Sequence, residues 1–244
     1  MLFRSYAADR LLDARTLGEE ASAAELEERH RFHHQHKRAF LTGIAIASIF
    51  LTVLLHRLDG GALRLQALLA SLLFAYFFLI HIFPSTSLAT ETGAHRLPKE
   101  LAVGIFFPAA VFVPTVARVP HLRALLVPNA LIFAAVCTLN CLFLYAWEHP
   151  GVRSSAHWTT RFATRHLASL SSITAILSFT LAFMEHRHVS TPLWLLAFAC
   201  GCSASLLLLL HTLQRRISAI HLRAAADLVL LTPALLIPLA RVAR

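Results

Sequence analysis

Long apolar stretches separated by short polar segments fill the chain from Phe40 to its last residues. Seven of them are long enough to cross a bilayer, since a transmembrane helix needs roughly 17–25 mostly apolar residues. Backbone N–H and C=O groups in lipid must be satisfied within the protein, so each stretch must be helical. The fold class predicted is all-α, a polytopic integral membrane bundle of seven transmembrane helices. The predicted spans are 39–56, 62–83, 101–117, 122–147, 167–184, 191–213 and 224–240.

The polar beginning of the chain contrasts with everything that follows it. Residues 1–38 are rich in charge, and the apolar start Met1–Phe3 is too short for the core of a signal peptide. We therefore expect two parts: a polar N-terminal segment over 1–38, which begins in water or at the membrane interface, and a transmembrane domain over 39–244.

The composition agrees with a membrane protein. The chain is 57% hydrophobic and only 14% charged, whereas soluble domains have about 25% charged residues. The formal net charge of +9 could suggest a nucleic-acid partner, but the basic residues lie in loops that flank the predicted helices. There they set orientation and contact anionic lipid head groups. We therefore expect membrane lipids as partners and no nucleic acid, and no protein partner can be inferred.

The distribution of Lys and Arg predicts the orientation. Of the 22 such residues, 15 fall in the N-terminal segment and in the loops on its side, and 7 fall on the opposite side. The positive-inside rule then places the N-terminus in the cytoplasm and the C-terminus outside. We expect an integral protein of a bacterial-type inner or plasma membrane.

All four cysteines fall inside predicted spans: Cys137, Cys141, Cys200 and Cys202. A free cysteine there behaves as a small hydrophobic side chain. Their spacing matches no metal-binding pattern, so we expect them to pack in the core.

Asp9 and Asp13 are the first candidate site residues. On a helix their spacing places both carboxylates on one face, roughly 6 Å apart. Two such carboxylates can share a Mg²⁺ ion, which binds through one or two carboxylates plus substrate phosphates. The same spacing also suits an ordinary solvated helix in which these aspartates pair with Arg10 and Arg15.

Two loops on the side of the N-terminus carry further polar side chains. In the loop 84–100, Arg96 and Lys99 could bind phosphate oxygens, or could serve only to set the orientation. The loop 148–166 offers Glu148 as its one carboxylate. Asp227 is predicted to be the only acid well within a helical span, with Arg223 one turn earlier as its partner; a structural and a functional role for it both stay open.

The layout resembles the UbiA superfamily of intramembrane prenyltransferases. Members have nine helices, an aspartate motif NDxxDxxxD after the second helix and a DxxxD motif after the sixth. Asp9 and Asp13 match the last two aspartates of the first motif, with Ser5 and Tyr6 at its Asn and first Asp positions. The segment from Pro84 through Arg96, Pro98 and Lys99 to Gly104 resembles the loop after the fourth helix. The seven predicted spans would then correspond to the last seven of nine, in a divergent and N-terminally shortened member.

The resemblance implies an activity and a site. In the family, Mg²⁺ ions held by the two aspartate motifs bind the diphosphate of an isoprenyl donor, and the isoprenyl group passes to a lipid-soluble acceptor. Carried over, Asp9 and Asp13 would bind Mg²⁺, with Glu148 as a further metal ligand, and Arg96 and Lys99 would bind the diphosphate. Because the loop 148–166 contains no aspartate, the alternative is a non-catalytic membrane protein with a lipid-binding or scaffold role, and whether the chain is an enzyme stays open.

Overall fold

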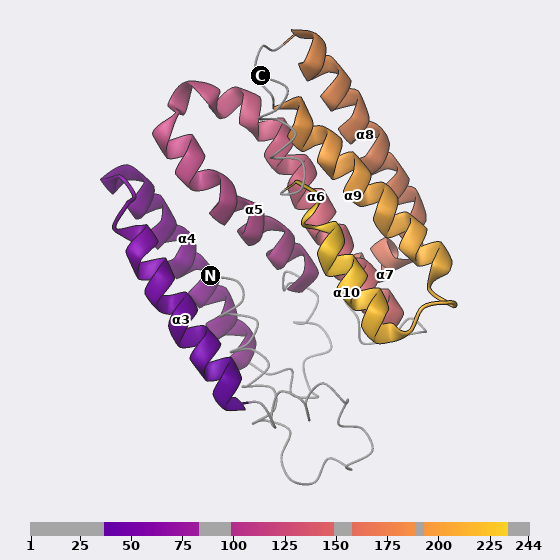
Figure 1. Ribbon diagram of the computed structural model, residues 1–244, viewed down its shortest axis with the longest axis horizontal. Helices are drawn as coiled ribbons and strands as arrows, with labels where there is room; N and C mark the ends of the chain where they lie inside the picture. Colours follow the sequence, from indigo (N-terminus) through magenta and orange to yellow (C-terminus); the bar gives the residue numbers. More distant parts are fainter. Residues whose placement is uncertain (1–36, 83–98, 149–157, 189–192, 234–244) are drawn as a thin grey trace. The chain divides into compact units, whose positions relative to one another are not determined.

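The computed structural model describes residues 37–82, 99–148, 158–188 and 193–233, in which every regular element is a helix (Figure 1). The elements are α3 (Lys37–Leu55), α4 (Gly60–Ile82), α5 (Lys99–Arg118), the short 3₁₀ helix η2 (Pro120–Leu122), α6 (Arg123–Glu148), α7 (Trp158–Arg165), α8 (Leu167–His188), α9 (Trp194–Leu213) and α10 (Ala219–Val229).

The chain divides into two units, Met1–Leu63 and Arg64–Arg244. In the first unit, α3 satisfies its polar side chains internally. The hydroxyls of Ser48 and Thr52 donate to the carbonyls of Ile44 and Ser48, one turn back, at 2.6 and 2.9 Å. Such local bonds let a hydroxyl lie on an apolar helix without a partner from elsewhere. The predicted division at residue 38 stays a prediction, because residues 1–36 lie outside the described part of the chain.

Four helices of the second unit are long and apolar enough to cross a membrane. They cover Leu101–Arg118, Pro120–Trp147, Leu167–His188 and Trp194–Leu213. The chain is accordingly an integral membrane protein of helical type, embedded among membrane lipids. The apolar parts of α3 and α4 are shorter and α10 has 11 residues, so the number of seven spans stays a prediction.

Helix α6 is the centre of the second unit, because it contacts α5, α7, α8, α9 and α10. Burial follows this position: 44% of the α6 span is buried, against 17% of the α5 span. Phe143 of α6 is fully buried and packs in a cluster with Leu207 of α9 and Ala226 of α10. Cys137 and Cys200 are buried in a second cluster, which confirms core packing for these two cysteines.

The α8–α9 hairpin is held together by small side chains. Ser171, Ala175 and Ser178 are buried along one face of α8, and the Ser171 hydroxyl donates to the Ala204 carbonyl of α9 at 2.8 Å. A Cβ at Gly201 of α9 would come within 2.7 Å of the Phe179 ring. Small residues allow this close approach, which is how helices associate where lipid provides no hydrophobic driving force.

Helix α5 packs closely on α6 as well. A Cβ at Gly104 would overlap the side chain of Thr138, so only glycine fits there. Pro114, inside α5, has no N–H and leaves the carbonyl of Ala110 without its helical donor. The side-chain amide of Gln66 in α4 donates to that carbonyl at 2.9 Å. A polar residue of one helix thus repairs the gap that a proline opens in its neighbour.

Most helix boundaries lie within a few residues of the predicted spans, with two exceptions. Helix α8 runs to His188 rather than ending at 184, which brings Glu185 into the helix. Helix α10 runs from Ala219 to Val229, so it begins before the predicted 224, which brings Arg223 into the helix, and it ends inside the predicted span 224–240. The two differences concern Glu185 and Arg223, which both take part in the polar sites described below.

Candidate functional site

Asn129 of α6 and Glu185 of α8 form a buried polar pair, here called the Asn129 site. Their exposed fractions are 0% and 6%. The Asn129 Nδ2 donates to Glu185 Oε1 at 2.6 Å, and its distance to the Leu125 carbonyl is 3.4 Å. Asn129 Oδ1 and Glu185 Oε2 are also buried, and neither has a hydrogen-bond partner among the described residues. The site therefore contains two oxygens that require a donor.

The prediction that Asp227 is the only acid well within a helix is wrong, because Glu185 is such an acid and is buried more deeply. A signal for it exists in the sequence. Glu185 continues the spacing of the small buried residues of α8, which are Ser171, Ala175, Ser178 and Ala182. Residues spaced by three or four lie on one face of a helix, so the stripe that packs against neighbouring helices ends in a carboxyl group.

A second polar group, the Asn140 site, lies three turns further along α6. The side chain of buried Asn140 hydrogen-bonds to the carboxylate of Asp227 in α10, and Arg223 attracts the same carboxylate. Asp227 itself is exposed. The predicted interaction between Arg223 and Asp227 is thus present, and Asn140 is a partner that the sequence did not indicate.

Near the ends of α6 and α9, Trp147 meets His211. The indole N–H of Trp147 donates to His211 Nδ1 at 3.1 Å, so this histidine accepts at Nδ1. The His211 ring also lies 5.2 Å from the ring of buried Phe143, centre to centre. These contacts fix the position of the Trp147 indole.

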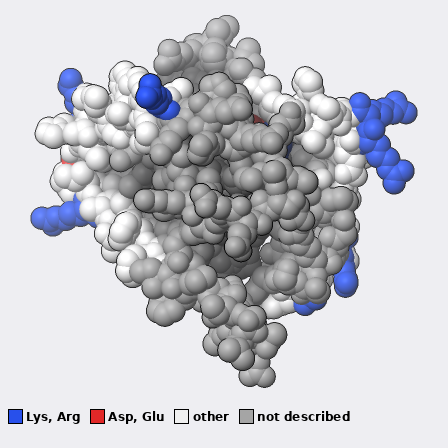
Figure 2. Space-filling view, turned by 90° about the horizontal axis from the view of Figure 1, so that it is seen from below, with Lys and Arg blue, Asp and Glu red and all other residues white. Residues whose placement is uncertain are grey.

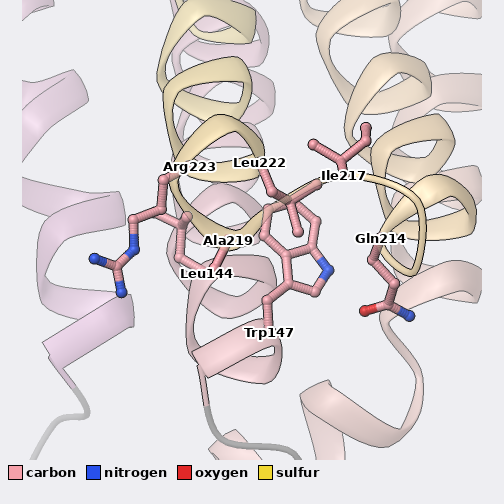
Figure 3. A pocket seen from close by; sticks show the side chains of 7 residues that line it. All are labelled: Leu144, Trp147, Gln214, Ile217, Ala219, Leu222 and Arg223. Carbon is pink, nitrogen blue, oxygen red and sulfur yellow. The ribbon is translucent and has the colours of Figure 1, made fainter. Parts of the chain in front are cut away.

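The indole of Trp147 lines a small cavity of about 150 Å³ (Figure 3). Ala219 and Leu222 of α10 lie across from the indole, and Gln214 lies to one side. Arg223 also lines the cavity, and its guanidinium points away from the indole. The complete lining is Leu144, Trp147, Gln214, Ile217, Ala219, Leu222 and Arg223. An apolar floor with an amide and a cation at its rim suits an amphiphile with a negatively charged head.

Several arginines of the second unit belong to this end of the bundle. Figure 2 views the end that is at the bottom of Figure 1, and where side chains are described on that face, Lys and Arg protrude while almost no acid is visible. The arginines near the end of α9 and in α7 and α10 are Arg161, Arg165, Arg215, Arg216 and Arg223. This charge favours anionic head groups at the same end as the cavity.

Of the predicted site residues, Asp9, Asp13 and Arg96 lie outside the described residues. Lys99 begins α5 and Glu148 ends α6, although their side chains are not described. Since α5 and α6 run antiparallel (Figure 1), the backbones of both residues lie at the end of the bundle that holds the cavity. Among the described residues, no group of three or more His, Cys, Asp or Glu could hold a metal ion.

Comparison of the chain with protein-family models, with curated proteins and with solved structures finds no match.

Proposed function

We propose that the protein binds an isoprenyl diphosphate at the basic end of its second unit and transfers the isoprenyl group to a lipid-soluble acceptor, as a UbiA-like prenyltransferase. The observation that carries the proposal is the shared location of three features. The cavity around Trp147, the start of α5 at Lys99 and the end of α6 at Glu148 all belong to this end of the bundle. In the orientation expected from the charge distribution, it faces the cytoplasm.

The residues at this end suit the two parts of such a ligand. Leu144, Trp147 and Leu222 provide apolar surface in the cavity. An isoprenyl chain can bind to this surface and remain in contact with lipid. Arg223 at the rim, together with Arg96 and Lys99, would bind diphosphate oxygens through charge-assisted hydrogen bonds. A dry apolar surface also protects a reacting allylic group from water.

Magnesium belongs to this proposal through Asp9, Asp13 and Glu148. Carboxylates with a substrate phosphate are the ligands that Mg²⁺ prefers, and the bound ion would stabilise the charge that develops on the leaving diphosphate. Arg223 also attracts the carboxylate of Asp227, so a carboxylate lies near the basic side chain at the rim.

The second candidate is a non-catalytic lipid-binding or scaffold protein. The segment 148–166, in which the second aspartate motif of the family would lie, contains no aspartate. With one motif alone, binding of the diphosphate would remain and transfer would be lost. This alternative shares the binding site of the first candidate and differs only in the chemical step.

Binding and transfer can be measured on the purified full chain in lipid nanodiscs. We expect a radiolabelled isoprenyl diphosphate to bind in a Mg²⁺-dependent way. Arg223→Gln should weaken binding about tenfold, which corresponds to about 1.4 kcal/mol. Arg187→Gln is the matched control, because Arg187 lies in the last turn of α8 at the other end of the bundle, with its guanidinium 4.9 Å from the centre of the Phe183 ring. It should leave binding unchanged.

The outcomes separate the two candidates. Binding together with formation of a prenylated product supports the enzyme. Mg²⁺-dependent binding without product supports the lipid-binding protein. Binding that is independent of Mg²⁺ and equally affected by Arg223→Gln and Arg187→Gln contradicts both. Asp13→Asn should remove the Mg²⁺ dependence, because one remaining carboxylate holds this strongly hydrated ion poorly.

A further inference from the structure

The Asn129 site lies away from the proposed lipid site, near the start of α6 and the end of α8, and the proposed function does not use it. Glu185 is at least nine-tenths buried, and only one of its two oxygens has a described partner. An ionised carboxylate buried without a cation is costly. In a membrane such a group pairs with another side chain or faces a water-filled cavity.

The groups around Glu185 offer no cationic partner for it. Among the described residues, the hydrogen-bond partner of its carboxyl group is Asn129. The next three residues of α8 are exposed. Helix α9 has no Lys or Arg, and α7 carries its arginines at the opposite end of the bundle. The charged or titratable side chains of η2 and the first turn of α6, His121 and Arg123, are exposed. The titratable or charged groups of these elements are His186, Arg187 and His188 of α8, Cys200, Cys202 and His211 of α9, Arg161 and Arg165 of α7, Cys137, Cys141 and Tyr145 of α6, His121 and Arg123 before Asn129, and the exposed Arg118 at the end of α5.

The two oxygens without a described partner identify what the pair requires. An ionised carboxylate can only accept hydrogen bonds, and an amide oxygen can only accept, so neither can satisfy the other. A protonated carboxyl group gains one donor. Its Oε2–H could donate to Asn129 Oδ1 while Asn129 Nδ2 donates to Oε1, which closes a reciprocal ring of two hydrogen bonds. A hard cation such as Ca²⁺ needs about six to eight oxygen ligands, whereas this site provides two oxygens without a described partner, Asn129 Oδ1 and Glu185 Oε2.

We propose that Glu185 binds a proton in the folded protein and that Asn129 holds it there, so that the α6–α8 contact is a proton-binding site within the membrane bundle. The proton comes from water and is returned to it, and no other group changes. Loss of the proton leaves a negative charge between two helices with only one amide donor facing it. Proton release is therefore coupled to loosening of the contact between α6 and α8.

Infrared spectroscopy of the full chain in lipid vesicles tests the proposal. The glutamate side chains carry ¹³C at the carboxyl carbon, which separates the bands of glutamate from those of aspartate. We expect wild-type protein at neutral pH to show the carbonyl band of a protonated glutamate. Glu185→Gln should lose the band and retain the fold, because its amide can form the same two hydrogen bonds with Asn129. Asp227→Asn is the matched control and should retain the band.

Each result decides the matter. If Glu185→Gln fails to fold, Glu185→Asp keeps a carboxyl group but replaces the labelled carbonyl with an unlabelled one, so the ¹³C-shifted band should disappear. A wild-type spectrum at neutral pH that contains only ionised glutamate bands overturns the proposal. A protonated band that persists unchanged in both Glu185 variants belongs to another residue and overturns it as well.

Discussion

Two asparagines on one helix show how differently the same side chain can function in this bundle. Asn129 and Asn140 are eleven residues apart on α6, about three turns, and both are buried. Each hydrogen-bonds to a carboxyl group of another helix. Glu185, at the first site, is buried and has no basic partner among the described residues. Asp227, at the second, is exposed and lies near Arg223.

This difference separates a closed part of the bundle from an open one. At the Asn140 site, next to the cavity around Trp147, the positive charge of Arg223 and the hydrogen bond from Asn140 both favour an ionised Asp227, and they oppose the effect of burial, which raises the pKa of this carboxyl group. At the Asn129 site, Glu185 has neither an exposed surface nor a described cation beside it. Only the hydrogen bonds within the pair can stabilise its carboxyl group. Exposure to solvent and a nearby cation thus decide whether a carboxylate can remain ionised or has to bind a proton.

The largest effect should come from separating α5 from α6 without touching either asparagine. Gly104 faces Thr138, which lies on α6 between the two sites, and a side chain there has no room. We expect Gly104→Val to destabilise the protein by about 3 kcal/mol, at the upper end of the range for overpacking. Unfolding in mixed detergent micelles measures this.

Gly61→Val provides the control, because nothing lies within 4 Å of a Cβ at Gly61. Its effect should stay within about 0.5 kcal/mol, as for an ordinary surface change. Equal destabilisation by the two valines would show that α5 and α6 are not packed as closely as described.

Loss of the amide at the buried site should have the next largest effect. Asn129→Leu removes the hydrogen-bond partner of Glu185, and a buried polar group left without a partner costs about 1–3 kcal/mol. The measurement is the same unfolding titration, made with wild-type protein and with Glu185→Gln as references. An unchanged stability in Asn129→Leu would mean that Glu185 finds another partner, and the contrast between the two sites would no longer hold.

The corresponding change at the open site should have the smallest effect. Asn140→Leu removes one hydrogen bond to Asp227. The Asp227 carboxylate is still attracted by Arg223 and is still exposed to solvent. We expect a loss of about 0.5–1 kcal/mol, the net value of an ordinary hydrogen bond. If Asn140→Leu proves more damaging than Asn129→Leu, the assignment of the closed and the open site is reversed.

The sequence predicts the helices better than it predicts the sites. Apolar length alone located α5, α6 and α9 to within a few residues, because backbone hydrogen bonding forces such stretches into helices. It ended the α8 span at 184, where the apolar stretch gives way to Glu185 and three basic residues. In the structure, Asn129 accommodates Glu185, and the helix continues to His188. Three basic residues in its last turn suit the negative end of the helix dipole.

Pairing between helices cannot be inferred from one sequence when the partners are far apart. Asn129 and Glu185 are separated by 56 positions, and Trp147 and His211 by 64. An asparagine within an apolar stretch looks the same whether it faces lipid, a neighbouring helix or a carboxylate. The predicted residues Asp9, Asp13 and Arg96 stay predictions, since they lie outside the described residues, and so do the roles of Lys99 and Glu148.

The close approach of Gly201 to Phe179 has a consequence for the order of events during synthesis. Contacts between α8 and α9 join residues that are near one another in the sequence, so the hairpin can form as soon as both helices have left the ribosome. Asn129, by contrast, is translated 56 residues before Glu185, so the hydrogen bond between them can form only after α8 has been made. Until α8 arrives, α6 carries an amide whose eventual partner has not yet been translated. The α8–α9 hairpin therefore brings Glu185 to Asn129 as part of a preassembled pair of helices, and the central helix of the bundle completes its hydrogen bonding only late in translation.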